Sequence, residues 1–394
     1  MPRIGWMICG ICKESHAGEA RVAVVPESLP ALFKLGVSIV VGSGAGREAH
    51  FPDELYEARG ATIVDASQVW ALSDLVLKIH PPTLEEATLM KEGAILVSFL
   101  YPSQNLEVVR CLSAKKVTAF AMELIPRISR AQSMDALSSQ ATVAGYKAAL
   151  LAASFLPKFF PLLMTAAGTI PPAKVLVLGA GVAGLQAMAT ARRLGAVVEG
   201  YDIRPAAREQ VESVGARFVE LPLQVEEAET KGGYARALGE EFYRRQQELL
   251  AERCAQVDAV ITTALVPGRR APILVSQGAV EAMRAGSVIL DVAAEQGGNC
   301  ALTVPGKTVI HRGVTIHGPV NLPSTMAVHA SAMYSRNLVS FLSYLFADGK
   351  PDWDRDDEVV CAPLVLRQGE PVHQPTRAAL ASGEPIGSSA TSTP

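Results

Sequence analysis

Three glycines with the spacing GxGxxG directly follow the apolar run Val175–Leu178. Gly179 permits a tight turn, Gly181 lets a ligand approach the backbone, and Gly184 allows a helix to pack closely on the strand. The first N–H groups of such a helix, which begins near Val182, can bind phosphate oxygens. The pattern predicts a strand, a turn and a helix that bind the diphosphate of a dinucleotide.

A second apolar run, Val197–Tyr201, ends in the acidic residue Asp202. A carboxylate at this place accepts hydrogen bonds from the ribose hydroxyls and repels a 2′-phosphate. Asp202 therefore favours NAD over NADP. Arg204 follows two residues later, and an arginine there can instead serve a 2′-phosphate.

The segment 127–140 is dense in hydrogen-bonding side chains, among them Arg127, Gln132, Asp135 and Ser138. It lies between the two α/β regions of the sequence, where cofactor sites form. It holds too few carboxylates and histidines for a metal site, and we predict none. The same residues suit a helix cap at Asp135 or an Arg127–Asp135 ion pair, and their spacing does not decide between cap and site.

Composition narrows the function further. The net charge is −3, which provides no basic field for nucleic acid. Hydrophobic residues make up 49% of the chain and charged residues 19%, as expected where strands are buried on both faces. Cys9 and Cys12 form the one CxxC motif, and without a second such pair we interpret them as buried thiols in the first strand.

Short apolar runs alternate with helical stretches along the chain, which predicts parallel sheets. We expect an α/β protein of two Rossmann-like domains with a cofactor cleft between them. The first domain is predicted to comprise residues 1–137 and 320–375, the second residues 138–319, and residues 376–394 a disordered tail. The apolar stretch 148–170 is long enough to span a bilayer, but Pro157, Lys158 and Pro161 interrupt it. We interpret it as a buried helix followed by a loop. The predicted strands are Trp6–Cys12, Val37–Val41, Leu75–Ile79, Ala94–Phe99, Val117–Ala121, Lys174–Leu178, Val197–Tyr201, Ala259–Thr262, Ser287–Val292 and Val314–His317.

Several of these motifs together resemble one family, the NAD(H)-binding domain I, or alpha-1 subunit, of proton-translocating NAD(P) transhydrogenase. The resemblance runs from about Glu14 to a helix predicted over residues 326–346. It rests on the segments Arg127–Gln140, Gly179–Ala187, Tyr201–Arg204, Gly232–Ala235, Ile261–Gly268 and Asp291–Cys300.

The resemblance implies roles for individual residues. Arg127, Gln132, Asp135 and Ser138 would surround the nicotinamide, with Ile128 and Ser129 beside them. The diphosphate and adenosine ribose would contact Gly179, Gly181, Val182, Gly184, Asp202, Ile203 and Arg204. Ala264 and Leu265 belong to a further cofactor-binding segment, and Gly233 and Tyr234 to a mobile loop that closes over the nucleotide.

Alanine dehydrogenases share this architecture and provide the alternative function. Arg21 and Lys78 stand where those enzymes place carboxylate-binding groups, and Glu295 where they place an aspartate. Their catalytic histidine falls near Tyr101. An amino-acid dehydrogenase needs a base, whereas hydride transfer between two nicotinamides needs none. Tyr101 therefore favours the transhydrogenase.

The sequence holds a single dinucleotide motif and no predicted membrane span. The resemblance therefore implies partner subunits that bind NADP(H) and cross the membrane, a homodimer of this chain, and a cytoplasmic location peripheral to the inner membrane. A non-catalytic NAD sensor is a further hypothesis, which hydride-transfer assays with the partner can distinguish.

Overall fold

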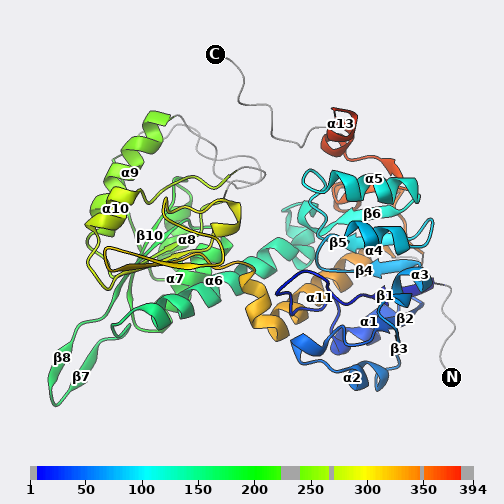
Figure 1. Ribbon diagram of the computed structural model, residues 1–394, viewed down its shortest axis with the longest axis horizontal. Coiled ribbons are helices and arrows are strands. Elements are labelled where there is room, and N and C mark those ends of the chain that lie inside the picture. Colours follow the sequence, from blue (N-terminus) through cyan, green and yellow to red (C-terminus); the bar gives the residue numbers. More distant parts are fainter. Residues whose placement is uncertain (1–6, 223–239, 266–269, 347–349, 383–394) are drawn as a thin grey trace. The chain divides into compact units, whose positions relative to one another are not determined.

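The computed structural model describes residues 7–222, 240–265, 270–346 and 350–382. The chain divides into two units, residues 1–140 with 323–394 and residues 141–322, near the boundaries that the sequence predicts. Both units are α/β and both sheets are mainly parallel (Figure 1), so the predicted fold class is confirmed.

The first unit contains an eight-stranded sheet in the order β17-β16-β6-β5-β4-β1-β2-β3. Strands β1 to β6 run parallel, and β16 and β17 add an antiparallel edge beside β6. The strands are β1 (Met7–Ile11), β2 (Val37–Gly42), β3 (Thr62–Val64), β4 (Leu75–Leu77), β5 (Ile95–Ser98), β6 (Thr118–Ala121), β16 (Leu364–Arg367) and β17 (Glu370–Pro371).

The helices of the first unit lie in the connections between these strands and in the returning C-terminal part of the chain. They are α1 (Leu29–Phe33), α2 (Asp53–Glu57), α3 (Gln68–Leu72), α4 (Leu84–Leu89), α5 (Leu106–Ala114), α11 (Ala327–Leu345), α12 (Glu358–Cys361) and α13 (Gln374–Ser382), with 3₁₀ turns η1 (Pro26–Ser28), η2 (Arg47–Ala49), η3 (Met122–Leu124), η4 (Ser129–Met134) and η6 (Leu322–Met326) near them.

The second unit contains a seven-stranded sheet in the order β11-β10-β9-β12-β13-β15-β14, parallel except for β14. The chain starts at β9, builds β10 and β11 on one side, and then crosses to β12 on the other. This reversal places a ligand-binding position at the carboxyl ends of β9 and β12. The strands are β9 (Lys174–Leu178), β10 (Val197–Tyr201), β11 (Arg217–Phe218), β12 (Ala259–Thr262), β13 (Val288–Asp291), β14 (Thr308–His311) and β15 (Val314–His317).

The helices of the second unit follow the same pattern of strand and crossover. They are α7 (Val182–Arg193), α8 (Ala207–Ser213), α9 (Glu240–Cys254) and α10 (Gln277–Ala282), with the 3₁₀ turn η5 (Ala294–Gln296). The long helix α6 (Ala136–Phe155) leads into this unit and is followed by the hairpin of β7 (Leu163–Thr165) and β8 (Gly168–Ile170).

The predicted strands agree with the observed ones because their apolar side chains are buried on both faces of each sheet. Val175 to Leu178 of β9 are all buried, as are the four residues of β12 and of β13. Full burial of such a side chain contributes about 1.5–3 kcal/mol relative to exposure. Cys9 and Cys12 are also buried free thiols, as predicted, and burial raises the pKa of Cys9 to about 12.

The structure differs from the predictions at two places. Residues 163–170 form the β7–β8 hairpin instead of a loop, extending from the end of α6 in Figure 1. Residues 376–382, predicted to be disordered, belong to α13, because burial of Thr376 and Ala379 holds this helix on the first unit. Among the described residues, no helix combines the length and the hydropathy needed to cross a bilayer.

Candidate nucleotide-binding site

The glycine turn of the second unit has the geometry that its spacing predicts. Gly179 follows β9 with a positive φ of 104°, which favours glycine. A Cβ on Gly184 would overlap the carbonyl oxygen of Gly179, so the first turn of α7 packs directly on the strand end. A Cβ on Gly181 would meet no atom within 4 Å. The open side of the turn thus lies at Gly181, where phosphate oxygens can approach the helix N-terminus beginning at Val182.

Asp202 lies immediately after β10 and is joined to the turn by a hydrogen bond. The Ala180 N–H donates to Asp202 Oδ2 over 2.8 Å. Arg204 donates to the same carboxylate through Nε and Nη2, at 2.9 and 3.0 Å. The structure thus brings Asp202, Ile203 and Arg204 to the carboxyl edge of the sheet beside the glycine turn. It also shows that Arg204 is bound to Asp202.

Thr263 is a member of this site that the sequence analysis did not single out. Its hydroxyl donates to the carbonyl oxygens of Leu178 and Gly179, at 3.3 and 3.1 Å. These bonds hold the end of β12 against the glycine turn and bring Ala264 and Leu265 beside it. The signal in the sequence was a threonine directly after a buried strand at the switch point of the sheet.

In the first unit, Asp135 caps helix α6. Its Oδ1 accepts the Ser138 N–H at 2.9 Å and its Oδ2 accepts the Ser138 hydroxyl at 2.6 Å. Arg127 Nε lies 4.0 Å from Asp135 Oδ2. Both the cap and the ion pair that the spacing allowed are therefore present, and Arg127, Asp135 and Ser138 form one cluster.

The rest of this segment forms the 3₁₀ turn η4, one face of which is anchored. Ile128 packs on the core of the first unit, and the Asn337 side chain donates to the Ser133 carbonyl oxygen at 2.9 Å. Ser129 and Gln132 are exposed. An anchored turn with exposed polar side chains is suited to orient a polar ligand.

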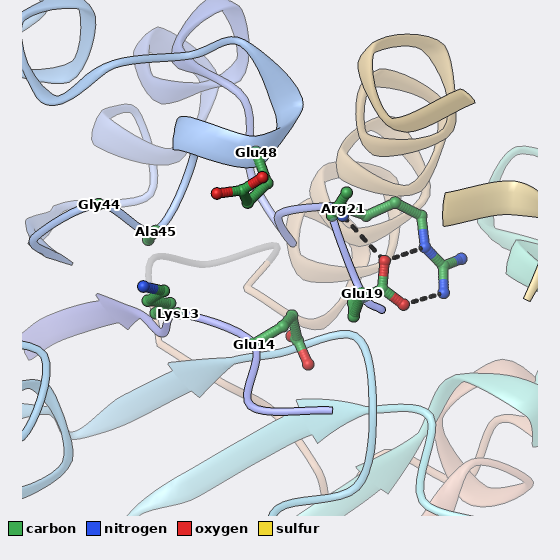
Figure 2. Close-up of a pocket in the computed structure, with 8 residues that line it drawn as sticks. Lys13, Glu14, Glu19, Arg21, Gly44, Ala45 and Glu48 are labelled. Carbon is green, nitrogen blue, oxygen red and sulfur yellow. Dashed lines mark hydrogen bonds and ion pairs between the residues drawn. The ribbon is translucent and has the colours of Figure 1, made fainter. Parts of the chain in front are cut away.

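Arg21 and Lys78, the two cations of the alanine dehydrogenase alternative, are paired with carboxylates of their own unit. Arg21 donates to both oxygens of Glu19 through Nε and Nη2, at 2.8 and 2.6 Å (Figure 2). Its Nη1 donates to Gln140 Oε1 at 2.8 Å. His80 Nε2 also lies 2.6 Å from Glu19. The charge of Arg21 is thereby directed at a buried internal partner.

Lys78 is buried between two carboxylates in the same region. Its Nζ lies 2.9 Å from Glu14 and 3.6 Å from Glu86. Burial lowers the pKa of Lys78, but the two carboxylates outweigh burial and the pKa is raised. Glu14 follows β1 and Lys78 follows β4, so this pair lies at the reversal point of the first sheet, where a ligand would bind. Glu14, Glu19 and Arg21 also line the pocket in Figure 2.

Tyr101 lies where the alternative function needs a histidine, in a short loop after β5. Its φ is 43°, and the N–H groups of Leu100 and Tyr101 donate to the two oxygens of Glu123, at 3.0 and 2.5 Å. Burial raises the pKa of Glu123 to about 7 against the opposing effect of these donors. The sequence analysis missed Glu123, because only the fold brings it beneath this loop.

Three further positions complete the account of the predicted residues. Gly233 and Tyr234 lie outside the described residues. Glu295, which stands where alanine dehydrogenases place an aspartate, accepts the Asn321 N–H at 2.6 Å within the second unit.

Comparisons with known proteins cover both units. Residues 10–144 match the N-terminal domain of the alanine dehydrogenase/PNT family, and residues 148–374 match its C-terminal domain. The chain is 47% identical over 383 residues to the first of the separately encoded alpha chains of the NAD(P) transhydrogenase of Rhodospirillum rubrum, covering 93% of this chain and 98% of that protein. It is 30% identical over 331 residues to the alanine dehydrogenase of Bacillus subtilis, covering 81% and 80%.

Solved structures give the same two relatives. The transhydrogenase of Sinorhizobium meliloti has a TM-score of 0.81 and 42% identity, covering 93% of this chain and 99% of that one. An L-alanine dehydrogenase has a TM-score of 0.80 and 27% identity, covering 95% and 99%. The chain belongs to the alanine dehydrogenase/PNT family and, within it, to the NAD(P) transhydrogenase alpha subunits.

Proposed function

We propose that this chain is the NAD(H)-binding subunit of a proton-translocating NAD(P) transhydrogenase. A hydride passes from C4 of NADH to C4 of NADP⁺ on a partner subunit, leaving NAD⁺ and NADPH, and the transfer is coupled to proton movement across the membrane. The observation that carries the assignment of NAD(H) to this chain is Asp202 at the end of β10, hydrogen-bonded to the glycine turn.

In the second unit, the glycine turn binds the diphosphate and Asp202 binds the adenosine ribose. Gly179, Gly181, Val182 and Gly184 offer the helix N-terminus to the phosphates. The open space at Gly181 supports this assignment. Asp202 disfavours a 2′-phosphate by its charge, and Arg204 is bound to that same carboxylate. Ile203, Ala264 and Leu265 complete the binding surface.

In the first unit, Arg127, Gln132, Asp135 and Ser138 orient the nicotinamide, with Ile128 and Ser129 beside them. The support is the Arg127–Asp135–Ser138 cluster on an anchored turn. These residues hold the ring through hydrogen bonds and supply no base. Hydride transfer needs the two C4 atoms about 3–3.5 Å apart, so orientation is the main catalytic contribution that this chain can make.

The ion pairs of Arg21 and Lys78 argue against an amino-acid dehydrogenase. A substrate carboxylate would have to displace Glu19 from Arg21, or Glu14 from Lys78, and leave a buried carboxylate without its cation. Removing one partner from a buried pair costs about 3–5 kcal/mol. Tyr101, in place of the histidine base, supports the same conclusion.

The remaining parts of the reaction belong to partners. NADP(H) binding and proton movement are assigned to membrane-spanning and NADP(H)-binding subunits, which hold this chain on the cytoplasmic face of the inner membrane. We also propose a homodimer of this chain. Exposed apolar side chains at Phe159, Leu162, Met164 and Ile170 support a protein interface near the β7–β8 hairpin.

The direct test mixes the purified chain with the partner's NADP(H)-binding domain and follows reduction of an NAD analogue by NADPH. The expected result is transfer that requires both proteins. A chain that binds NADH but gives no transfer with the partner would instead be an NAD sensor. Production of pyruvate and NADH from alanine and NAD⁺ would overturn the proposal in favour of alanine dehydrogenase.

A further inference from the structure

The side chain of Asn299 holds the peptide of Ala264 from both sides. Asn299 Oδ1 accepts the Ala264 N–H at 3.0 Å, and Asn299 Nδ2 donates to the Ala264 carbonyl oxygen at 2.8 Å. Nδ2 also donates to the Pro272 carbonyl oxygen at 2.8 Å. Asn299 is fully buried. An amide that both accepts from and donates to one residue fixes the position of that residue's backbone.

Asn299 is in turn held by Asp291, a fully buried carboxylate at the end of β13. Asp291 Oδ2 accepts the N–H groups of Asn299 and Cys300, at 2.8 and 3.0 Å, and the Thr303 hydroxyl at 2.6 Å. Its Oδ1 accepts the Thr262 hydroxyl at 2.8 Å and the Ala293 N–H at 3.1 Å. Five donors on one buried carboxylate make this loop a rigid support.

This support acts on one side of the nucleotide site. Ala264 follows β12, which pairs with β9 on the side opposite β10. The Ala264 nitrogen would lie 3.0 Å from a Cβ on Gly179, so the held peptide adjoins the glycine turn. Asp202 marks the adenosine side, beyond β10. A dinucleotide that crosses the turn must therefore extend its other half towards Ala264 and Leu265.

We propose that Asn299, held by Asp291, is a positioning residue for the nicotinamide half of NAD(H). It acts through the Ala264–Leu265 backbone and touches no nucleotide itself. The inference rests on the proposed function, since it specifies which half of the bound nucleotide this loop serves. It predicts that loss of the Asn299 amide separates binding of the whole dinucleotide from binding of its adenosine half.

The experiment compares NADH with AMP, which keeps the adenosine ribose and one phosphate, by calorimetric titration of the full chain. In Asn299→Ala we expect NADH to bind at least about tenfold more weakly and AMP to bind within about twofold of the unmodified chain. Asp202→Ala should weaken both ligands. Gln277→Ala is the matched amide control, because its exposed side chain forms its hydrogen bond with Glu281 along the surface of α10, and it should change neither.

Equal weakening of NADH and AMP in Asn299→Ala would mean a general structural role and would overturn the inference, as would unchanged NADH binding. If Asn299→Ala does not fold, Thr303→Val removes one donor from Asp291 at nearly constant volume. It should show the same NADH-selective loss, about threefold, and no such selectivity would again overturn the inference. An unmodified chain that binds AMP but not NADH would overturn the proposed function as well.

Discussion

The carboxylate of Asp202 grips the guanidinium of Arg204 at both of its oxygens, with Nε–Oδ1 at 2.9 Å and Nη2–Oδ2 at 3.0 Å. The side chains are 8% and 13% exposed. The arginine that could serve a 2′-phosphate is thus bound by the residue that repels one. This pair makes nucleotide selectivity depend on two groups, which can be separated by mutation.

We therefore expect the unmodified chain to bind NADH more tightly than NADPH. Asp202→Ala removes the ribose hydrogen bonds and should weaken NADH binding by roughly 1–3 kcal/mol. The same change releases Arg204 and removes the repulsion, so NADPH should lose less affinity than NADH or gain some. Fluorescence titration with both nucleotides measures the ratio. In Asp202→Ala/Arg204→Ala the advantage to NADPH should disappear, and equal affinities in the unmodified chain would refute the assignment.

The two glycines of the turn should respond differently to one added methyl group. Gly184→Ala places a Cβ against the Gly179 carbonyl oxygen and should destabilise the fold by about 1–3 kcal/mol. Gly181 has open space and a φ of −76°, which alanine adopts without strain. Gly181→Ala should keep its unfolding temperature but bind NADH about tenfold more weakly, because the methyl occupies phosphate space. Thermal unfolding and NADH titration on both variants test this, and full NADH affinity in Gly181→Ala would contradict it.

Gln132 is exposed on the anchored turn η4, so its substitution should leave the fold intact. Gln132→Asn shortens the side chain by one methylene and misplaces the nicotinamide. We expect the transfer rate with the partner domain to fall about tenfold or more while NADH affinity changes little. Ser133→Ala, in the same turn and also exposed, is the matched control. Parallel losses of rate and affinity in Gln132→Asn would show that it binds the nucleotide without orienting the ring.

Glu123 should make stability depend on pH near neutrality. Its pKa is raised to about 7, mainly by burial. The folded chain therefore holds a proton that the unfolded chain releases near pH 4.5, and this contribution is present below pH 4.5 and lost as the pH rises through 7. Glu123→Gln stays neutral, so it should be destabilising at pH 5 relative to the unmodified chain and less so, or stabilising, at pH 8. The expected change between the two conditions is about 1–3 kcal/mol, measured by urea unfolding. A stability difference that is the same at both pH values would contradict it.

The sequence alone determined the parts of this protein that depend on local pattern. The strands β9, β10 and β12, the turn at Gly179–Gly184 and the acidic residue after β10 are encoded by contiguous residues, since burial on both faces requires apolar runs and a tight turn requires glycine. Helix α11 follows its predicted range for the same reason. The β7–β8 hairpin was missed because its apolar residues carry no alternation that distinguishes a strand from a loop.

Only the tertiary structure decided how distant residues act together. Asp135 as a cap, Arg204 bound to Asp202 and Arg21 bound to Glu19 were each one of several local options, and packing selected among them. Glu123 beneath Tyr101 and Asn299 around Ala264 had no sequence signal, because each contact joins segments separated by 22 or 35 residues. Buried polar groups must find partners wherever the fold provides them, and a one-dimensional pattern does not show which partner comes within hydrogen-bonding distance.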